Sequence, residues 1–393
     1  QGPVNLGRLE AIPELVERAD LKFPAFRPRI PERLRQSENV FSTIAEGDIL
    51  LHHPYESFVP FIEMLHQAAS DPQVVSIRQT LYRTGAGSAV ADALLKAAHA
   101  GKDVLVVIEL RARFDEAANI ELANALQAAG AQVVYGVVGH KTHAKMCMII
   151  RREGRRLVRY VHLGTGNYHE RTARAYTDYG LLSSDQELGQ DVQKIFQQIA
   201  ALGKAGKLKA ILQSPFTLHS GVLELIEIQR QKALQGQPAL IQAKMNALTE
   251  PSVIRALYGA SQAGVHIDLI IRGICCLRPG VKGVSENIRV RSIVGRFLEH
   301  MRVYCFGVDE EREVFLSSAD WMDRNLFRRV EACFPVRDPV LAKRVYREAM
   351  SNYLSDNTQA WELTSDGSYR KLKSRGKAHT AQGALLMDLT EHS

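Results

Sequence analysis

An internal repeat restricts the fold of this chain more than any other feature of its sequence. The stretch AGKDVLVVIE at 100–109 is matched by AGVHIDLIIR at 263–272, which lies 163 residues later. A second pair, IRQT at 77–80 and IQAK at 241–244, is separated by 164 residues. A repeat of this length indicates two similar domains rather than a solenoid of short units. The sequence therefore predicts a tandem duplication of one domain.

Within each half, short apolar runs alternate with helical patterns. Such alternation predicts a largely parallel sheet with helices on both faces. The first half should contain strands at 74–77, 103–110 and 132–138, a hairpin of 143–151 with 156–163, and helices at 58–69, 89–100, 116–129 and 187–202. The second half should contain strands at 239–245 and 266–272 around a helix at 252–263. The expected fold class is therefore α/β, and a site is expected where the strand ends of the two sheets converge.

Length and proline placement set the expected domain boundaries. A chain of 393 residues is long enough for two domains. Prolines at 24, 28 and 31 indicate that a linker ends there, and the chain starts at Gln1 without an initiator methionine. We expect residues 1–30 to be the tail of a missing preceding domain. The first of the two repeated domains should then span 31–207 and the second 208–393.

Composition excludes several classes of protein. An apolar share of 46% with 24% charged residues is ordinary for a globular chain and excludes wholesale disorder. No apolar run approaches the roughly 20 residues of a membrane-spanning helix. Five cysteines without CxxC spacing argue against a disulfide scaffold or a zinc site and favour the cytoplasm. The net charge of +7 permits an anionic partner without identifying one.

A histidine followed by a basic residue two positions later occurs three times, and two of these matches, one in each half, lead into a turn of small residues. Alone the pattern is weak. With 13 histidines, and with lysine or arginine at 50 of the 393 positions, roughly 1.7 matches are expected by chance. The two matches are 157 residues apart, and each precedes a turn of small residues, whereas His169-Glu-Arg171 is interpreted as a chance match. The two motifs and their turns are His143-Ala-Lys145 with GTGN at 164–167, and His300-Met-Arg302 with SSAD at 317–320.

This combination of residues suits phosphoryl transfer. If each motif lies on a strand, its imidazole and its cation share one face and point into the cleft together. A neutral imidazole can attack phosphorus, and a second imidazole can move protons. Nearby cations stabilise the transferring phosphoryl group and lower the pKa of the histidine by like-charge repulsion. A turn of small residues can offer its backbone N–H groups to phosphate oxygens.

The paired motifs resemble the phospholipase D superfamily, and longer stretches are similar to bacterial polyphosphate kinases. The resemblance covers nearly all of 30–350 and implies the family's two C-terminal catalytic domains. It implies two tandem phospholipase D-like domains, each with a mixed, mostly parallel sheet flanked by helices, and an active site in the cleft between them. The stretches that carry it are SIRQTLYRT at 76–84, ELRARFDE at 109–116, HKTHAK at 140–145, GTGNY at 164–168 and SSADWMDRN at 317–325.

The resemblance also implies a role for individual residues. His143 would be the phosphohistidine nucleophile, and His300 the second catalytic histidine, in contact with ATP. Because an arginine cannot ligate a metal, Mg²⁺ would be held mainly by the phosphates themselves. The other implied residues are the catalytic cations Lys145 and Arg302, the phosphate and magnesium pair Arg83 and Arg113, the ATP contacts Tyr176 and Arg272, and the tunnel residues Arg329 and Glu331.

The implied activity is reversible transfer of the terminal phosphoryl of ATP to polyphosphate through a phosphohistidine, with release of ADP. The expected cofactor is Mg²⁺, and the expected partners are ATP or ADP, polyphosphate, the missing N-terminal domains and further copies of the chain. No nucleic acid is expected, and peripheral association with the inner membrane is left open.

Other readings remain. A phospholipase D-type phosphodiesterase or nuclease would carry an aspartate five residues after the lysine, where this chain has Ile150. A non-catalytic module that binds polyanions is the third reading. Tyr176 could serve packing alone, His162 is interpreted as a structural neighbour, and the basic residues between 370 and 377 are interpreted as a solvated segment.

Overall fold

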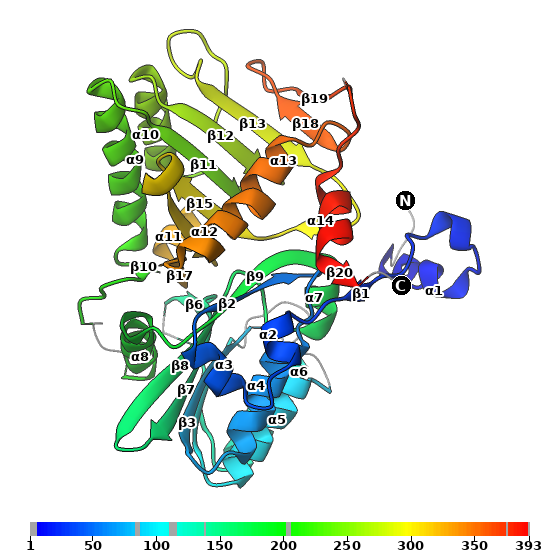
Figure 1. The fold of residues 1–393 in the computed structure, drawn as a ribbon, viewed down its shortest axis with the longest axis vertical. Helices are drawn as coiled ribbons and strands as arrows, with labels where there is room; N and C mark the ends of the chain where they lie inside the picture. Colours follow the sequence, from blue (N-terminus) through cyan, green and yellow to red (C-terminus); the bar gives the residue numbers. More distant parts are fainter. Residues whose placement is uncertain are drawn as a thin grey trace.

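The computed structural model describes residues 6–82, 87–109, 116–136, 139–201, 206–374 and 376–391. Two α/β units are stacked along the long axis of the molecule, the first half of the chain below and the second above (Figure 1). A small helical segment around α1 (Ile12–Leu15) projects to one side (Figure 1). The chain leaves this segment through β1 (Arg27–Pro28), which pairs with β20 (Thr390–Glu391) near the other terminus.

The lower sheet mixes parallel and antiparallel pairs. Its order is β14-β9-β8-β7-β3-β4-β5, and β2 also pairs with β9. The neighbours β3, β4 and β5 are parallel, and β7, β8 and β9 form antiparallel pairs. The strands are β2 (Ile49–His53), β3 (Val74–Leu81), β4 (Asp103–Ile108), β5 (Gln132–Val134), β7 (Lys145–Glu153), β8 (Arg156–Gly164), β9 (Tyr176–Ser183) and β14 (Leu298–Glu299).

Helices cover both faces of this sheet, as alternation predicts. The apolar sides of α3, α4, α5 and α6 pack on one face, and α8 packs on the other. These helices are α3 (Val40–Ala45), α4 (Val59–Ser70), α5 (Ala89–His99), α6 (Glu116–Ala128) and α8 (Gln186–Ala201). The predicted helices and strands are present with small shifts at their ends, and the predicted strand at 132–138 ends at Val134, with residues 137–138 outside the described part.

The upper sheet follows the same plan. Its order is β10-β17-β16-β15-β11-β12-β13-β18-β19, and β6 pairs with β17. Its strands are β6 (Lys141–Thr142), β10 (Leu212–Ser214), β11 (Leu240–Met245), β12 (His266–Ile271), β13 (Ile288–Ile293), β15 (Arg302–Phe306), β16 (Glu313–Ser317), β17 (Arg329–Pro335), β18 (Ala360–Leu363) and β19 (Tyr369–Lys371).

The helices of the upper unit divide between the two faces of its sheet. On one side lie α9 (Leu218–Leu234) and α10 (Pro251–Gln262), and on the other α12 (Pro339–Tyr346), α13 (Asn352–Leu354) and α14 (Ala381–Leu389) (Figure 1). Of the basic cluster between 370 and 377, Arg370 and Lys371 lie exposed on β19, and Arg375 is outside the described residues.

The duplication extends to strand register. Ile77 faces Val104 across parallel strands, and its repeat partner Ile241 faces Ile267. Likewise Lys145 faces Gly164, and Arg302 faces Ser317. Gly164 in turn faces Gly180, and Ser317 faces Cys333. Four register-equivalent pairs follow for the residues discussed below: Lys145 and Arg302, Asn167 and Asp320, Tyr176 and Arg329, and Asp178 and Glu331.

The two units exchange short strands. β6 belongs to the first half of the chain but pairs in parallel with β17 of the upper sheet. β14 belongs to the second half but pairs in parallel with β9 of the lower sheet. The two exchanged strands, β6 and β14, are themselves register-equivalent, since Lys141 faces Arg329 and Leu298 faces Tyr176. Each motif histidine therefore follows a strand that is bound to the other unit.

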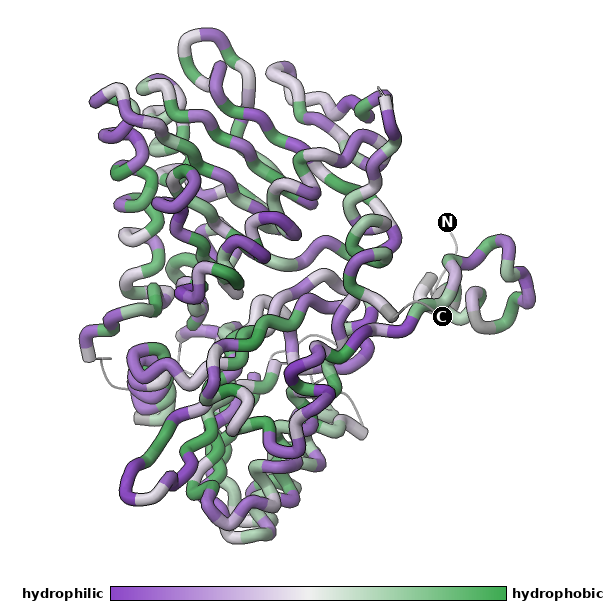
Figure 2. Tube along the Cα trace, viewed as in Figure 1, coloured by the Kyte–Doolittle hydropathy of each residue, from purple (hydrophilic) through white to green (hydrophobic). Residues whose placement is uncertain are grey.

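A shared apolar core joins the two units. Each unit has a core of its own under its outer helices. A third cluster contains residues of both sheets, such as Met146 and Leu163 below and Val303 and Leu316 above. Figure 2 shows hydrophobic positions along the strands, whereas the tip of the β7–β8 hairpin is hydrophilic. The two units are therefore packed together over faces that water does not reach.

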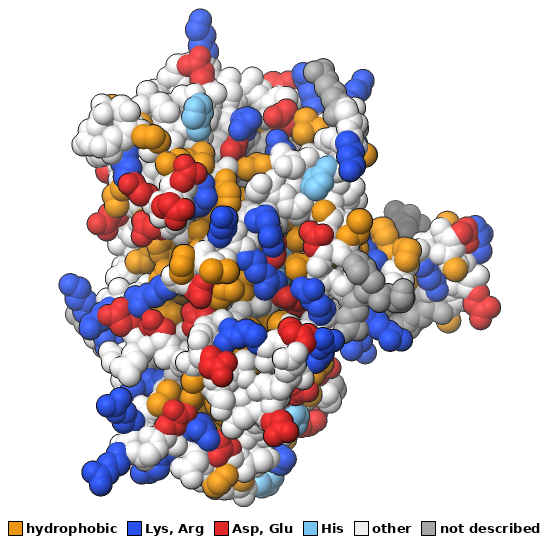
Figure 3. All heavy atoms as spheres, in the orientation of Figure 1, with side chains coloured by type: hydrophobic (Ala, Val, Ile, Leu, Met, Phe, Trp, Pro, Cys, Tyr) orange, Lys and Arg blue, Asp and Glu red, His pale blue; other side chains and the backbone are white. Residues whose placement is uncertain are grey.

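Buried ion pairs reinforce this junction. Arg344 of α12 donates to Glu348 and to Glu56, each at 2.8 Å, and His52 Nδ1 lies 2.8 Å from Glu348. His52 and Glu56 belong to the lower unit and the other two residues to the upper. Figure 3 shows lysine and arginine side chains gathered across the middle of this face, where the halves meet. Removing one partner of a buried pair typically costs about 3–5 kcal/mol, so these contacts hold the units in one relative position.

Two buried histidines of the lower unit should make the protein sensitive to acid. Burial lowers the pKa of His53 to about 4 and that of His162 to about 3. The unfolded value is about 6.5, so the unfolded chain binds more protons than the folded chain below that pH. Stability should be full above pH 6.5 and should fall by up to about 1.4 kcal/mol per pH unit for each histidine as pH decreases towards 4.

Urea denaturation at pH 7.5, 6.0 and 5.0 measures this dependence. His53→Gln should lower the slope of the unfolding free energy against pH by close to 1.4 kcal/mol per pH unit, which corresponds to about one proton. His99→Gln on the exposed end of α5 is the matched control and should leave the slope unchanged. An unchanged slope in His53→Gln would contradict the prediction that burial of His53 makes the fold sensitive to acid.

Candidate active site

His143 lies between β6 and β7, and both its backbone and its ring are held by residues of β17. Its backbone N–H donates to the carbonyl of Val330 at 2.9 Å, and its Nδ1 lies 2.9 Å from Glu331 Oε2. Both partners belong to β17 of the other half. The prediction that the motif lies on a strand is wrong in this detail, because β7 begins only at Lys145. The N–H that would continue β7 is used instead for the contact with β17.

His300 repeats this arrangement in the second half. It lies between β14 and β15, and Thr177 Oγ1 accepts from its backbone N–H at 3.2 Å. Its Nδ1 lies 2.8 Å from Asp178 Oδ2. Asp178 is the register-equivalent of Glu331. Each histidine is therefore oriented by a carboxylate of the opposite half, and the exchanged strands bring the two together.

The orienting carboxylates are themselves fixed. Glu331 is fully buried and accepts from Ser318 Oγ at 2.5 Å and from Asn325 Nδ2 at 2.7 Å. Asp178 accepts from Thr165 Oγ1 at 2.7 Å, and Gly166 lies so close that an added Cβ would be 2.2 Å from an Asp178 oxygen. A glycine is therefore required in the GTGN turn for close packing.

Electrostatics favour a neutral His143 with an ionised Glu331. Burial raises the pKa of Glu331, but His143 and Lys145 outweigh burial and lower it overall. Burial lowers the pKa of His143 to about 3, with further lowering by Lys145 and Arg329 against the opposing effect of Glu331. A neutral ring beside a carboxylate donates its Nδ1–H, which leaves the lone pair on Nε2. Among the described residues, Nε2 of His143 has no hydrogen-bond partner, so this atom can act as a nucleophile.

Arg302 lies against the ring of His300. Its Nη1 is 3.1 Å from Nε2 and 3.4 Å from Nδ1, and it also donates to the His300 carbonyl at 2.8 Å. Burial lowers the pKa of His300 as well, although Asp178 opposes the effect. The two histidines share a plan but differ at the atom that would attack phosphorus.

The two motif cations differ in the same way. Arg302 donates to Asp320 through Nε at 3.2 Å and Nη2 at 3.0 Å, and this carboxylate helps to raise its pKa. Lys145 Nζ donates to the backbone carbonyl of His143 at 2.5 Å and forms no ion pair with any carboxylate of the described residues. Burial lowers the pKa of Lys145 to about 7. Lys145 is thus a buried cation without a direct counter-charge.

The remaining predicted residues surround the two histidines where the structure describes them. The Tyr176 ring lies 5.3 Å from the His300 ring, centroid to centroid. Arg272 follows β12 and donates to Asn246 Oδ1 at 2.9 Å, and Asn246 donates to the His300 carbonyl at 3.2 Å. Arg329 Nη1 lies 3.9 Å from Glu331. Arg83 and Arg113 are outside the described residues.

Several site residues escaped prediction from sequence. Asp178, Thr165, Ser318, Asn325 and Asn246 all contact a predicted residue directly. Asp178 could have been found, since the GTGN and SSAD turns are 153 residues apart and the same offset relates it to Glu331. Thr165 lies in the GTGN turn, and Ser318 and Asn325 lie in the SSADWMDRN stretch, but no individual role was predicted for them. Asn246 is recognisable only once β11 and β15 are placed side by side.

Within the described ranges, no group of three His, Cys, Asp or Glu side chains is placed to hold a metal ion. The carboxylates at the site are engaged: Asp178 and Glu331 with histidines, and Asp320 with Arg302. The described residues therefore do not offer a ligand set to Mg²⁺.

Among the helices that the structure describes, none is long and apolar enough to span a membrane.

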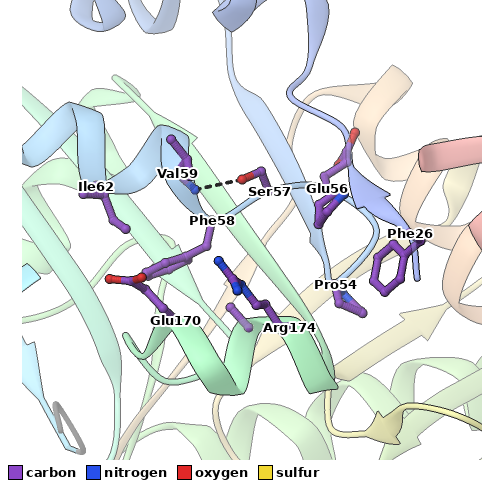
Figure 4. Close-up of a pocket in the computed structure, with 11 residues that line it drawn as sticks. Phe26, Pro54, Glu56, Ser57, Phe58, Val59, Ile62, Glu170 and Arg174 are labelled. Carbon is purple, nitrogen blue, oxygen red and sulfur yellow. Dashed lines mark hydrogen bonds between the residues drawn. The ribbon is translucent and has the colours of Figure 1, made fainter. Parts of the chain in front are cut away.

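A pocket of about 230 Å³ lies apart from this site. It is lined by Phe26, Pro54, Phe58, Glu170 and Arg174, among others, and contains none of the predicted site residues (Figure 4). Its closest connection to the site is α7 (Glu170–Ala175), which runs directly into Tyr176. The pocket is therefore not the place where the two motifs meet.

Comparisons with known proteins agree with this geometry. The model of polyphosphate kinase C-terminal domain 1 matches residues 39–205, and that of C-terminal domain 2 matches 211–382. Polyphosphate kinases of Xylella fastidiosa and Pseudomonas aeruginosa are 59% and 55% identical over 390 residues. These alignments cover 99% of this chain but 55% and 56% of the relatives. The chain thus spans about half the length of the curated relatives it matches.

Solved structures give the same result for the fold. The crystal structure of polyphosphate kinase from Porphyromonas gingivalis matches 95% of this chain and 58% of its own, with a TM-score of 0.88 and 35% identity. A phosphatidylserine synthase from Haemophilus influenzae matches 82% of this chain and 88% of its own with a TM-score of 0.52 at 12% identity, which is a likeness of fold alone. The predicted fold class, two tandem phospholipase D-like domains, is confirmed. The chain belongs to the polyphosphate kinase family, in which it corresponds to the two C-terminal domains.

Proposed function

We propose that this chain transfers the terminal phosphoryl group of ATP to polyphosphate, reversibly, through a phosphohistidine at His143. The observation that carries the proposal is the difference between the two Nε2 atoms. His143 presents a neutral ring whose Nδ1 is held by Glu331 and whose Nε2 has no partner among the described residues, whereas Arg302 Nη1 lies 3.1 Å from Nε2 of His300. A nucleophile with its ring orienter already in place is the arrangement that covalent phosphoryl transfer requires.

The proposed reaction has two steps. Nε2 of His143 forms a bond to the γ-phosphorus of ATP while the bond between that phosphorus and the bridging oxygen breaks, and ADP leaves. A terminal oxygen of polyphosphate then attacks the phosphohistidine, which restores the neutral ring and lengthens the polymer by one unit. Because either acceptor can discharge the intermediate, the reaction runs in both directions.

Cations around the site would stabilise the transferring group. Lys145 and Arg329 act on His143, Tyr176 lies beside His300, and Arg272 is linked to His300 through Asn246, where the nucleotide is proposed to bind. Arg302 is proposed to act through His300, whose ring it contacts. Arg83 and Arg113 are proposed to hold phosphate oxygens. Mg²⁺ is proposed to enter with the nucleotide phosphates, as part of the substrate rather than on protein ligands.

Label transfer tests the proposal. The protein is mixed with γ-³²P-ATP and Mg²⁺, quenched, and the label mapped by proteolysis. The expected result is acid-labile, base-stable label on the peptide that contains His143, discharged on addition of ADP or polyphosphate. Cleavage of a phosphodiester lipid or of nucleic acid without ATP would instead select the phospholipase D-type reading. Association into homo-oligomers, contact with further domains of the longer relatives, and a cytoplasmic or peripheral inner-membrane location remain predictions.

Lys145 should give the reaction an alkaline limit. Its pKa of about 7 means that it loses its charge as pH rises through neutrality. A cation that stabilises the transferring phosphoryl group must be protonated, so kcat/KM should fall by about tenfold per pH unit above that value. Lys145→Arg stays charged and should lose this limb, and Arg302 shows that the register-equivalent position accommodates arginine. The measurement is kcat/KM for ATP from pH 6 to 9, and an identical alkaline limb in both proteins would contradict the prediction.

A further inference from the structure

Charge is distributed unequally over positions that the fold makes equivalent. The positions around His143 are Lys145 and Asn167 of its own half and Arg329 and Glu331 of the other. The register-equivalent positions around His300 are Arg302 and Asp320, with Tyr176 and Asp178. The first set holds two cations and one carboxylate, and the second holds one cation and two carboxylates. The duplicated sites therefore differ in the sign of their net charge.

Of these differences, the one between Asn167 and Asp320 acts most directly on the motif cation of each half. Both oxygens of Asp320 accept hydrogen bonds from the guanidinium group of Arg302. Asp320 also accepts from the backbone N–H of Asn246 at 2.7 Å. Held in this way, Arg302 points its Nη1 at Nε2 of His300. Asp320 thus neutralises the motif cation of its half and fixes it over the atom that would attack phosphorus.

Asn167 occupies the same place in the first half without the charge. Its Oδ1 is buried and has no hydrogen-bond partner among the described residues. Lys145, the cation that it would otherwise engage, turns to the carbonyl of His143 instead. The result, among the described residues, is a lysine without an ion-paired carboxylate beside His143 and an Nε2 atom without a partner.

We infer that Asn167 is the specificity-determining residue that makes the first half the phosphoryl-accepting one, because it withholds a counter-charge from Lys145 where Asp320 supplies one to Arg302. The inference rests on the proposed function. Asn167 acts through Lys145 and is a positioning residue. An aspartate at 167 would neutralise the cation and draw it away from the incoming phosphate, as Asp320 does for Arg302.

Other charged and titratable groups face Lys145 and stay constant in the test. Glu331 and Arg329 of β17, Asp178 of β9 and Arg302 of β15 act on its charge. The Tyr82 ring lies 5.7 Å from Nζ, and His143 is its neighbour in the motif. None of these groups is changed by a substitution at 167, so a shift in the titration of Lys145 would report the new carboxylate.

The experiment compares Asn167→Asp with Asn167→Ala, which removes the amide without adding charge. Calorimetry with tripolyphosphate and label transfer from γ-³²P-ATP are measured on both variants and on the unchanged chain. Asn167→Asp should weaken tripolyphosphate binding by about tenfold. It should slow labelling of His143 on the order of 10²-fold, and it should move the alkaline limb to higher pH. Asn167→Ala should lose clearly less than Asn167→Asp in both measurements, because no counter-charge is added.

Two outcomes would overturn the inference. One is an Asn167→Asp variant that binds tripolyphosphate and takes up label like the unchanged chain. The other is an Asn167→Ala variant that loses as much as Asn167→Asp, which would mean that the amide itself contacts phosphate. If the unchanged chain takes up no label, the proposed function fails, and the tripolyphosphate affinities of the two variants still decide whether Asn167 controls the charge of Lys145.

Discussion

Changing His143 to alanine is expected to abolish covalent labelling and to lower turnover by a factor on the order of 10⁴ or more, as removal of a nucleophile does in other covalent enzymes. The physical reason is that Glu331 holds the ring in place while Nε2 has no hydrogen-bond partner among the residues that the structure describes. No other described imidazole combines a carboxylate on Nδ1 with an open Nε2 beside an uncompensated cation. Rapid-quench labelling with γ-³²P-ATP, together with steady-state synthesis of polyphosphate, measures both effects.

A matched control is available in the chain. His169-Glu-Arg171 has the same motif spacing, but His169 caps the short helix α7 by accepting from the N–H of Thr172 at 3.3 Å. His169→Ala should keep label and turnover close to those of the unchanged chain. If the melting temperature of His143→Ala stays within a few degrees of that of the unchanged chain, the loss of label and turnover in this variant comes from the missing imidazole and not from unfolding. Stable label in His143→Ala would move the nucleophile to His300.

Glu331→Gln should have the second largest effect, a loss in labelling rate on the order of 10³-fold. An amide can offer its nitrogen to Nδ1 and so favour the wrong tautomer, and this exchange in a histidine–carboxylate pair costs about 10⁴-fold in a well-studied case. Glu331 is fully buried and already accepts from Ser318 and Asn325, so the amide has little freedom to choose another orientation. Single-turnover labelling against pH is the measurement.

Asp178→Asn is the comparison for this change, because it makes the same substitution at the register-equivalent carboxylate. It disturbs His300 rather than the nucleophile, so labelling of His143 should suffer less than turnover. Equal effects of the two substitutions on the labelling step would mean that both histidines act before the phosphoenzyme forms, and that our division of roles is incorrect.

The sequence alone predicts the parts of this site that lie in one continuous segment. The two motifs and their turns could be found because each spans about 25 residues and recurs at nearly the same offset. The flanking strands β4 and β12 could be found because apolar residues dominate both, with VLVVI at 104–108 and LII at 269–271. Glu331 was identified through the family resemblance rather than through any pattern of its own.

What could not be predicted depends on how the halves meet. β6 and β14 are two residues long, too short for any periodicity to reveal, yet they bring each histidine to its carboxylate. The prediction that His143 lies on a strand failed for the same reason, since its N–H bonds to Val330 of the other half. Asp178 has no motif of its own, and only the offset between the two turns points to it, because its partner His300 lies 122 positions away.

The strand exchange has a consequence for ancestry. A single unit of this design cannot orient its own histidine, so a precursor of one unit would have worked only as a symmetric pair of identical subunits. In such a pair every substitution appears twice, and an aspartate beside one motif is an aspartate beside both. Joining the two genes removes that constraint. One copy can then gain a counter-charge while the other keeps an amide, and a site with two identical halves becomes a site whose halves differ in charge.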